Sequence, residues 1–199
     1  EQIKKQKIPL VESIVVNRGQ KSFKSEVEKL KQSGAQSIII VMIEKEAGHF
    51  IQELHNHGLK IPIISHWGIL GGDFFKKNKS YLDEFDLKVF QTFSFDRKPN
   101  KIARKLLETY KERYDSDVTV DYAVAQSYDL VMLLAKAIEK AQSSNGEKVR
   151  EALKAIKSYE GAVKTYYQPF ASDEQDALGE SDYHFASFDA KGKLVPLGK

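Results

Sequence analysis

The feature that most constrains the fold is an uninterrupted apolar run, Ile38-Ile-Ile-Val-Met-Ile43. A strand with one solvated face alternates apolar and polar side chains, whereas a parallel strand covered on both faces shows no such alternation. The run therefore predicts a parallel strand over residues 37–43 that other layers cover on both faces. Like the apolar run at residues 130–134, it falls far short of the roughly 20 residues that span a bilayer, so we expect no direct membrane insertion.

Helices and strands alternate around this run. Phe23, Val27 and Leu30 recur at helical spacing before Gly34, which predicts a helix over residues 22–33 that the glycine ends. Another helix is predicted at residues 46–56, and strands are predicted at residues 8–16, 61–65 and 87–93. Strand and helix in alternation with short connections are typical of βαβ units. The first half should therefore form an α/β fold, with a parallel sheet flanked by helices.

The character of the chain changes at residue 100. Helical periodicity then predicts consecutive helices at residues 100–114, 122–141 and 146–158. The middle helix is apolar nearly all round between Leu130 and Ile138, which favours burial between two layers. Short strands are expected at residues 163–167, 183–189 and 193–195, with a hairpin turn at residues 189–192. Residues 1–7 should be the end of a helix, and residues 171–182 a polar loop or a short helix.

Composition and motifs exclude several classes of protein. The 199 residues include 31 Lys or Arg and 28 Asp or Glu, and the resulting net charge of +3 is too small to indicate nucleic-acid binding. The absence of cysteine excludes thiol catalysis, thiolate metal sites and disulfides. The sequence has no phosphate-binding or dinucleotide-binding glycine motif and no nucleophile elbow, so no cofactor is expected.

One face of the helix predicted at residues 46–56 raises the question of a metal site. Glu46, His49, Glu53 and His57 recur at spacings of three and four, as a metal site with two ligands on one helix requires. This face lies opposite the apolar positions of the same helix. We therefore expect it to meet water, and we expect no metal site.

The most informative tetrapeptide is Ser65-His66-Trp67-Gly68. It stands just past the carboxyl end of a predicted parallel strand, where open α/β sheets bind ligands. Trp67 offers a flat face, Ser65 and His66 offer polar contacts, and a glycine permits close backbone approach. Neighbouring Ser and His side chains point apart in an extended segment, which favours binding over catalysis. The alternative role for the lone tryptophan is that of a core or interface anchor.

Two further strand ends should meet the same edge of the sheet. Met42, Ile43 and Glu44 follow the preceding strand, and Phe93 and Phe95 belong to the end of the next one. We therefore expect one cleft at this edge, although a core position is the more frequent one for the two phenylalanines. The complete set of candidate ligand-binding residues is Trp67, His66, Ser65, Glu44, Ile43, Met42, Phe93, Phe95 and Tyr122.

Several motifs occur in a recognisable order. They are Phe23-x-x-x-Val27-x-x-Leu30-x-x-x-Gly34-Ala35, His57-Gly58-Leu59-x-x-Pro62, Ala123-Val-Ala-Gln-Ser-Tyr128-Asp129-x-Val131-x-Leu133-Leu134, Val149-Arg-Glu-Ala-Leu153, Tyr159-Glu-Gly161 and Phe188-Asp-x-x-Gly192. In this order they resemble the type I periplasmic solute-binding proteins, in the branch of the branched-chain amino acid receptors. The resemblance covers nearly the whole chain.

The resemblance implies two α/β lobes that close over a small molecule, of which the first is incomplete here. Residues 1–118 would form the second, carboxy-terminal lobe. Residues 119–165 would supply helices that return to the first lobe, and residues 166–199 would form strands near the hinge. The amino-terminal sheet of the first lobe is expected to lie outside this sequence, either removed or on another chain.

The resemblance also bears on the ligand. The amino acid receptors place an acidic residue for the ligand ammonium just after the strand that here is residues 61–65, and the alignment puts Trp67 there. A buried ammonium without a carboxylate partner is costly. The site therefore favours a ligand with an apolar or aromatic portion, or an organic acid, over leucine, with Glu44 as a substitute charge.

The function implied is binding and not catalysis. The protein would be an extracytoplasmic solute-binding protein or sensor domain, periplasmic or extracellular, that captures an amino acid, aromatic acid or organic acid by lobe closure. Its partners would be that small molecule and an ABC transporter permease or a membrane-bound sensor, without nucleic acid. Two alternatives are a hydrolase-like α/β enzyme that uses Ser65 and His66, and the ligand-sensing domain of a transcription regulator, which would need an upstream helix-turn-helix.

Overall fold

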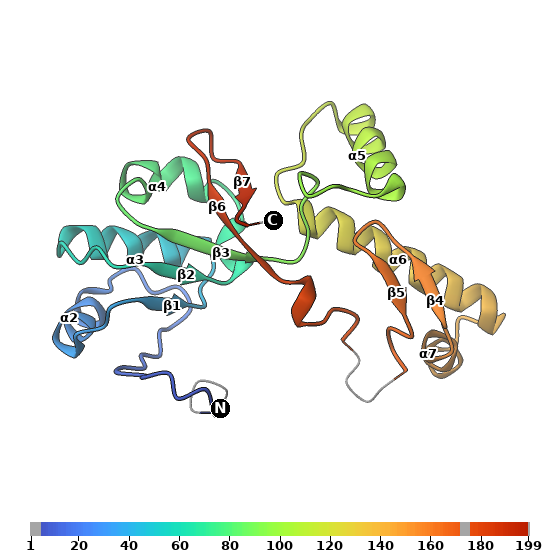
Figure 1. The fold of residues 1–199 in the computed structure, drawn as a ribbon, viewed down its shortest axis with the longest axis horizontal. Helices are drawn as coiled ribbons and strands as arrows, with labels where there is room; N and C mark the ends of the chain where they lie inside the picture. The colour runs from blue at the N-terminus through green and yellow to red at the C-terminus, as the bar shows by residue number, and fades with distance from the viewer. Residues whose placement is uncertain (1–4, 172–175, 199) are drawn as a thin grey trace. The chain divides into compact units, whose positions relative to one another are not determined.

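The computed structural model describes residues 5–171 and 176–198. The chain divides into two compact units, which Figure 1 shows in ribbon form. Unit 1 comprises Glu1–Phe90 and Phe185–Val195, and unit 2 comprises Gln91–His184 and Pro196–Lys199. The expected assignment of residues 1–118, 119–165 and 166–199 to lobes and hinge stays a prediction.

Unit 1 is built on a five-stranded sheet of order β1-β2-β3-β6-β7. Its strands are β1 (Ile38–Ile40), β2 (Ile63–Ser65), β3 (Leu87–Gln91), β6 (His184–Phe188) and β7 (Leu194–Pro196). The first three pair in parallel, with Ile38 opposite Ile63 and Ile63 opposite Leu87. The predicted parallel arrangement is confirmed for these strands, and it brings the carboxyl ends of β1 and β2 to one edge.

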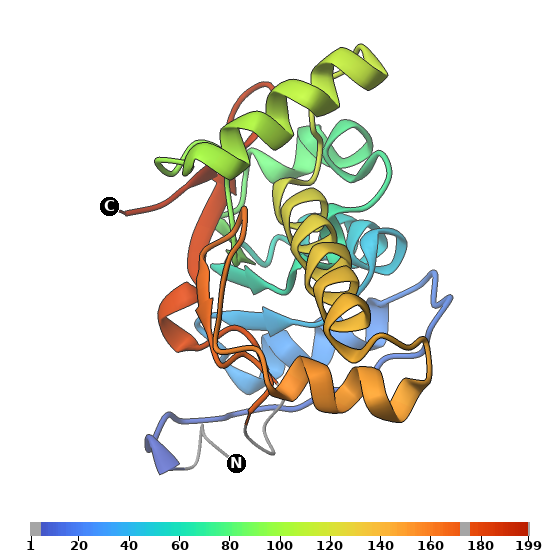
Figure 2. The same ribbon diagram turned by 90° about the vertical axis from the view of Figure 1, so that its right-hand side faces the viewer.

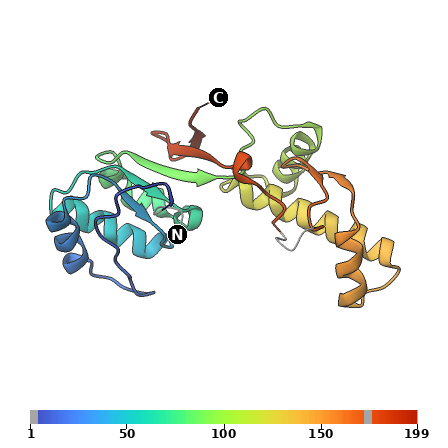
Figure 3. The same ribbon diagram turned by 60° about the horizontal axis from the view of Figure 1, so that its bottom comes forward.

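Three helices pack in a row in unit 1, and Figure 3 shows them in blue to green. They are α2 (Lys24–Ser33), α3 (Glu44–Asn56) and α4 (Phe74–Leu82). Their apolar residues share one core with Ile38, Ile40 and the buried apolar residues of β2 and β3. The predicted end of α2 is confirmed, because Gly34 takes the left-handed conformation with φ of 68°.

The helix α4 was missed in the sequence because its centre is polar. Its buried apolar residues, Phe74 and Leu82, lie at its two ends, and the buried residue between them is the polar Asn78. Phe75 lies against Phe188 of β6, with ring centroids 5.3 Å apart. These two phenylalanines are separated by 113 positions of sequence (188 − 75), which local periodicity cannot detect.

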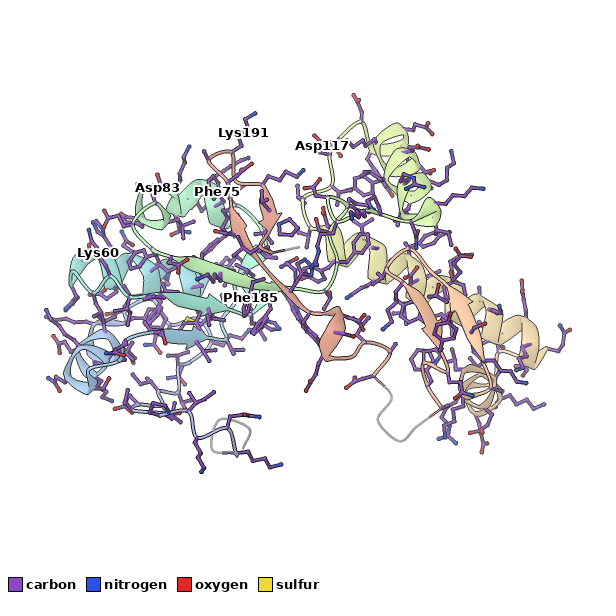
Figure 4. The ribbon with its side chains drawn as sticks, in the orientation of Figure 1. Lys60, Phe75, Asp83, Asp117, Phe185 and Lys191 are labelled. Atoms are coloured by element: carbon purple, nitrogen blue, oxygen red, sulfur yellow. The ribbon has the colours of Figure 1, made fainter. Side chains whose placement is uncertain are left out.

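The predicted hairpin turn between β6 and β7 is confirmed. Its amide N–H at Gly192 donates to the carbonyl of Asp189 at 2.9 Å, and Gly192 has φ of 82°. A Cβ at this position would run into the ring of Phe75, which Figure 4 labels together with Lys191 of the same turn. The turn therefore requires glycine both for its backbone conformation and for its contact with α4.

Two expectations about unit 1 are wrong. Residues 8–16 form no strand, although Ile14 and Val16 pack on the core while Val15 between them is 91% exposed. β1 is covered on one face only, because Ile39 is 62% exposed. Ile38 and Ile40 lie on the face of β1 that helices α2 to α4 cover. Ile39 lies on the opposite face, which no described element buries.

Unit 2 contains three helices and a two-stranded hairpin (Figure 2). These elements are α5 (Lys101–Tyr114), α6 (Asp121–Ala141), α7 (Gly146–Lys154), β4 (Ser158–Glu160) and β5 (Thr165–Tyr167). The three predicted helices are confirmed, but α7 ends before the predicted residue 158. Residue 158 instead pairs with Tyr167 in the antiparallel hairpin, so the tertiary pairing with β5 outweighs helical periodicity there.

A buried carboxylate ties the hairpin to α6. Asp129 is 1% exposed and accepts hydrogen bonds from the amides of Ala162 at 2.6 Å and Val163 at 2.9 Å, and from the Tyr166 hydroxyl at 2.9 Å. A Cβ at Gly161 would lie 2.5 Å from a carboxylate oxygen of Asp129. The connection between β4 and β5 therefore needs the acid on α6 and the glycine in the turn together.

The expectation that α6 is buried all round is wrong for the described chain. Its buried positions, Ala125, Asp129, Leu133 and Ala137, lie on one face. Leu130 and Val131 are each 62% exposed. Among the described residues α7, the hairpin, α5 and the segment with Phe93 and Phe95 pack on α6, and they leave Leu130 and Val131 exposed.

Two expectations fall partly outside the described residues. The helix end at residues 1–7 includes residues 1–4, and the polar segment at residues 171–182 includes residues 172–175, which the structure does not describe. The described part of the second segment contains a short 3-10 helix, Glu180–Asp182, as one of the two expected forms. Within the described ranges, no helix combines the length and the apolar composition needed to cross a membrane.

Candidate ligand-binding site

Two loops of unit 1 meet at the edge where β1 and β2 end. After β1 the chain passes through Met42 and Ile43 into α3, which begins at Glu44. After β2 it passes through His66 into a short 3-10 helix, Trp67–Leu70. The structure therefore brings these predicted site residues together at the edge where open α/β sheets bind ligands.

Contact between the two loops depends on Gly68. A Cβ at this position would lie 2.7 Å from the carbonyl oxygen of Met42 and 3.1 Å from Nδ1 of His66. Since any side chain would collide with the Met42 backbone, the loops would have to separate. The close backbone approach predicted for this glycine is thus made to the neighbouring loop of the protein itself.

The Glu44 carboxylate lies beside a second pair of glycines. A Cβ at Gly71 would be 3.1 Å from Oε2 of Glu44, and one at Gly72 would be 3.8 Å from its Cγ. Glu44 is half-buried and occupies the first turn of α3, where the free amides and the helix dipole favour a negative charge. This arrangement places a carboxylate at the same sheet edge as Trp67.

His66 and Ser65 make local hydrogen bonds that do not form a catalytic pair. Nδ1 of His66 accepts from the amide of Gly68 at 2.9 Å, so the neutral ring carries its proton on Nε2. The buried Ser65 hydroxyl donates to the carbonyl of His66 at 2.9 Å, not to the ring. This geometry does not activate the serine as a nucleophile.

Trp67 is half-buried and lies against the ring of His66. The two ring centroids are 4.3 Å apart, and the planes are inclined by 37°. Its partial exposure distinguishes it from a core residue such as Ile69, which is fully buried in the same short helix. An aromatic side chain held in this way keeps apolar surface for a ligand.

Glu46 is buried, although the helical spacing predicts it on a solvated face. Its side chain is 5% exposed, and its Oε1 accepts from the amide of Gly19 at 2.6 Å. This hydrogen bond from Gly19 is the main reason why the pKa of Glu46 lies below its usual range. In the described chain Oε2 has no hydrogen-bond partner. Glu46 thus fixes the turn around Gly19 to α3, a long-range contact that helical spacing does not signal.

The other members of the same predicted face form local contacts. Nε2 of His57 lies 3.1 Å from Oε1 of Glu53, whereas His49 is exposed. Among the described residues no group of three or more His, Asp or Glu side chains is arranged to hold a metal ion.

The three remaining candidates belong to unit 2. Phe93 and Phe95 are each 8% exposed and meet edge to face, with centroids 4.9 Å apart. Tyr122 packs against the same cluster, and burial raises the pKa of its hydroxyl. Their role in ligand binding stays a prediction, and the candidate site in unit 1 consists of Met42, Ile43, Glu44, Ser65, His66 and Trp67.

The parallel sheet, its helices and the loops at its carboxyl edge place the chain among α/β proteins. Comparison with known families then gives a narrower result: the family model described as "Periplasmic binding protein" matches residues 1–193. The chain belongs to the periplasmic binding protein family. The predicted fold class and the resemblance to type I periplasmic binding proteins are thereby confirmed.

Individual proteins agree with this result. The chain is 28% identical over 161 residues to the Leu/Ile/Val-binding protein homolog 1 of Brucella abortus, covering 80% of this chain and 40% of that protein. A leucine binding protein from Thermotoga maritima superposes with a TM-score of 0.78 at 20% identity, covering 94% of this chain and 51% of that one. A solute binding protein from R. palustris, solved in complex with benzoate, superposes with a TM-score of 0.71 at 15% identity. The superposition covers 98% of this chain and 51% of that one.

These comparisons have two consequences. The family and the similar proteins are binding proteins, not enzymes. The chain spans about half the length, or less, of the proteins it matches.

Proposed function

We propose that this chain is part of an extracytoplasmic solute-binding protein and that the carboxyl edge of β1 and β2 binds a small molecule. The observation that carries the proposal is the half-buried Trp67, held against His66 at 4.3 Å at this edge. Membership of the periplasmic binding protein family supports the same function. The chain would bind without performing chemistry, and an ABC transporter permease or a membrane-bound sensor would respond to the bound state.

We further propose a ligand with a flat or apolar portion that stacks on Trp67 and a charged group near Glu44. The similar proteins include one named for Leu, Ile and Val and one that holds benzoate, so both aliphatic and aromatic ligands occur among them. A carboxylate at Glu44 attracts an amino group and repels an approaching acid. The ligand's charge is therefore the property that Glu44 should control.

A panel of matched ligands tests the proposal by calorimetry and thermal shift. L-phenylalanine and 3-phenylpropionate share a ring and differ in the amino group, as L-leucine and 4-methylpentanoate share an aliphatic chain. We expect the aromatic members to bind more tightly, and the Glu44→Gln variant to lose any preference for the amino group. The matched control is Glu108→Gln, an exposed glutamate of unit 2 whose change should leave all affinities unaltered. Absence of binding across the panel by the folded chain would contradict the proposal.

A further inference from the structure

Five cationic side chains gather around the start of α5, the helix of unit 2 that Figure 1 labels. All five are exposed and form what we call the basic patch: Arg97, Lys98, Lys101, Arg104 and Lys105. At about 100° per residue, the three on the helix lie within an arc of roughly 100°. This arc points away from the buried Ala103. The loop before α5 and the solvent side of its first turns therefore carry the same charge.

The positive charge of the basic patch is largely unpaired. Within the described residues only Lys105 of the five has an ion pair, with Glu108 at 3.9 Å, whereas lysines of α4 and α7 pair along their helices. Residues 96–108 together carry five positive and two negative charges. The charge of Arg97 also reaches His184, whose pKa is lowered by burial first and by Arg97 next. The basic patch thus presents a net positive charge to solvent.

The stability of α5 does not explain this charge. The free amides at the start of a helix favour acidic side chains and disfavour cations. The first turn of α5 nevertheless has no acidic residue. A negatively charged partner would offset the unfavourable interaction of these cations with the helix dipole and with one another.

The backbone beneath the basic patch is held in place. Asn100, between the loop and the helix, caps α5 and donates from Nδ2 to the carbonyl of Gly161 in the hairpin turn at 2.8 Å. Nη1 of Arg104 donates to the carbonyl of Pro99 at 2.6 Å. These contacts tie the loop to the helix and the helix to the hairpin, so the cations of both segments form one surface.

The composition of the basic patch indicates the kind of partner. Interfaces with proteins are typically anchored by aromatic side chains and depleted in lysine. Three of the five cations are lysines, and every exposed side chain in residues 96–105 is charged. A cluster of about four to eight Lys or Arg on an amphipathic helix is typical of sites that bind anionic lipid headgroups. The patch therefore fits a lipid surface better than a protein surface.

We propose that the basic patch holds the protein on the surface of a membrane that contains anionic lipids, by attraction to their phosphate headgroups. Because residues 96–105 expose no apolar side chain, this is adsorption at the level of the headgroups and not insertion. The inference goes beyond the proposed function and rests on it in one respect: a permease or membrane-bound sensor would lie in the same membrane. Adsorption would bring the protein close to that partner, with or without its ligand.

Vesicle flotation tests the proposal with two vesicle preparations. One contains phosphatidylcholine alone, and the other a one-to-one mixture of phosphatidylcholine and the anionic phosphatidylglycerol. The patch variant carries Lys98→Gln and Lys101→Gln. The matched control carries Lys148→Gln and Lys157→Gln, at two exposed lysines of unit 2 outside the patch, so both variants lose the same charge. Circular dichroism of each variant checks that it is folded.

We expect the wild type and the control variant to float with the anionic vesicles and not with the neutral ones. The patch variant should bind the anionic vesicles at least about tenfold more weakly, since each lysine near an anionic surface contributes about fivefold. Salt at about 1 M, which screens charges beyond roughly 3 Å, should release the wild type.

Three results would overturn the proposal: no binding to the anionic vesicles, equal binding to both preparations, or equal affinities of the two variants. So would retention of the wild type, but not of the patch variant, on immobilised polyglutamate without vesicle binding, because the patch would then fit an acidic protein surface. Vesicle binding by a chain that binds no member of the ligand panel would count against the proposed function and leave this inference standing.

Discussion

At the scale of single residues, Asp129 is the side chain on which unit 2 depends most. Its carboxylate accepts from two backbone amides and a tyrosine hydroxyl in a buried setting. We predict that Asp129→Ala lowers the free energy of unfolding by at least about 3 kcal/mol, because buried donors lose a charged acceptor. Chemical denaturation measures this loss. The control is Asp117→Ala, which removes an exposed ion pair with Lys111 and should cost less than about 1 kcal/mol. Equal losses in the two variants would refute the role of Asp129.

The same region gives the protein an alkaline sensitivity. Burial, followed by the charge of Asp129, raises the pKa of Tyr159 to about 12, from its ordinary value of 10.0. Between these pH values the unfolded chain loses a proton that the folded chain retains, so stability falls as the pH rises. We predict that Tyr159→Phe is less sensitive than the wild type between pH 10 and 12, whereas Tyr167→Phe, at a 77% exposed position, behaves like the wild type. Thermal unfolding across this pH range measures the stability of each protein. Identical pH profiles for the three proteins would contradict the role of Tyr159.

At the scale of elements, two asparagine caps make unequal contributions. Asn100 caps α5 by accepting from the amide of Ala103 at 2.9 Å, and its Nδ2 also donates to the carbonyl of Gly161 at 2.8 Å. Asn145 caps α7 through amides of that helix alone. We predict that Asn145→Ala costs about 1 kcal/mol and that Asn100→Ala costs more, because it also releases the hairpin turn. Denaturant titrations of both variants measure the loss in free energy of unfolding. A smaller loss for Asn100→Ala than for Asn145→Ala would contradict the structure.

Local signals explain which elements the sequence predicted. The helices α5, α6 and α7 carry their periodicity locally, and α5 and α7 also have asparagine caps. Gly34 and Gly192 adopt the backbone conformation that a helix end and a turn require. Elements whose position depends on distant partners were not predictable in this way. Thus α4 buries apolar side chains only near its ends, with a polar residue, Asn78, buried between them, and β4 exists because β5 pairs with it.

The candidate site also has a part that local sequence predicts and a part that depends on distant contacts. The meeting of the loops at Glu44 and Trp67 follows from two parallel strands ending at one edge, and sequence alone predicted it. The burial of Glu46 on Gly19 depends on a contact 27 positions away, and local pattern gave the opposite expectation. The exposure of Ile39 and Leu130 was also unpredictable, because an apolar residue does not reveal which layer covers it.

At the scale of the whole molecule, the chain is a member of the periplasmic binding protein family that spans about half the length of its relatives. Unit 1 contains a sheet, a core and a strand edge with Trp67 and Glu44. Substitutions at these two residues therefore test ligand binding by this unit. Unit 2 contains helices and a hairpin with an open apolar face. The strand edge with Trp67 and Glu44 is the reason why we propose unit 1 as the ligand-contacting part.

Trp67 offers the most direct test of the central claim, because it is the one tryptophan of the chain and gives a single indole N–H signal by NMR. We predict that titration with the tightest ligand of the panel shifts this signal in a saturable way, with the dissociation constant found by calorimetry. Trp67→Ala should then weaken binding by more than tenfold, about 1.4 kcal/mol. Binding that leaves the indole signal unmoved, with the affinity of Trp67→Ala within about threefold of the wild type, would contradict the account.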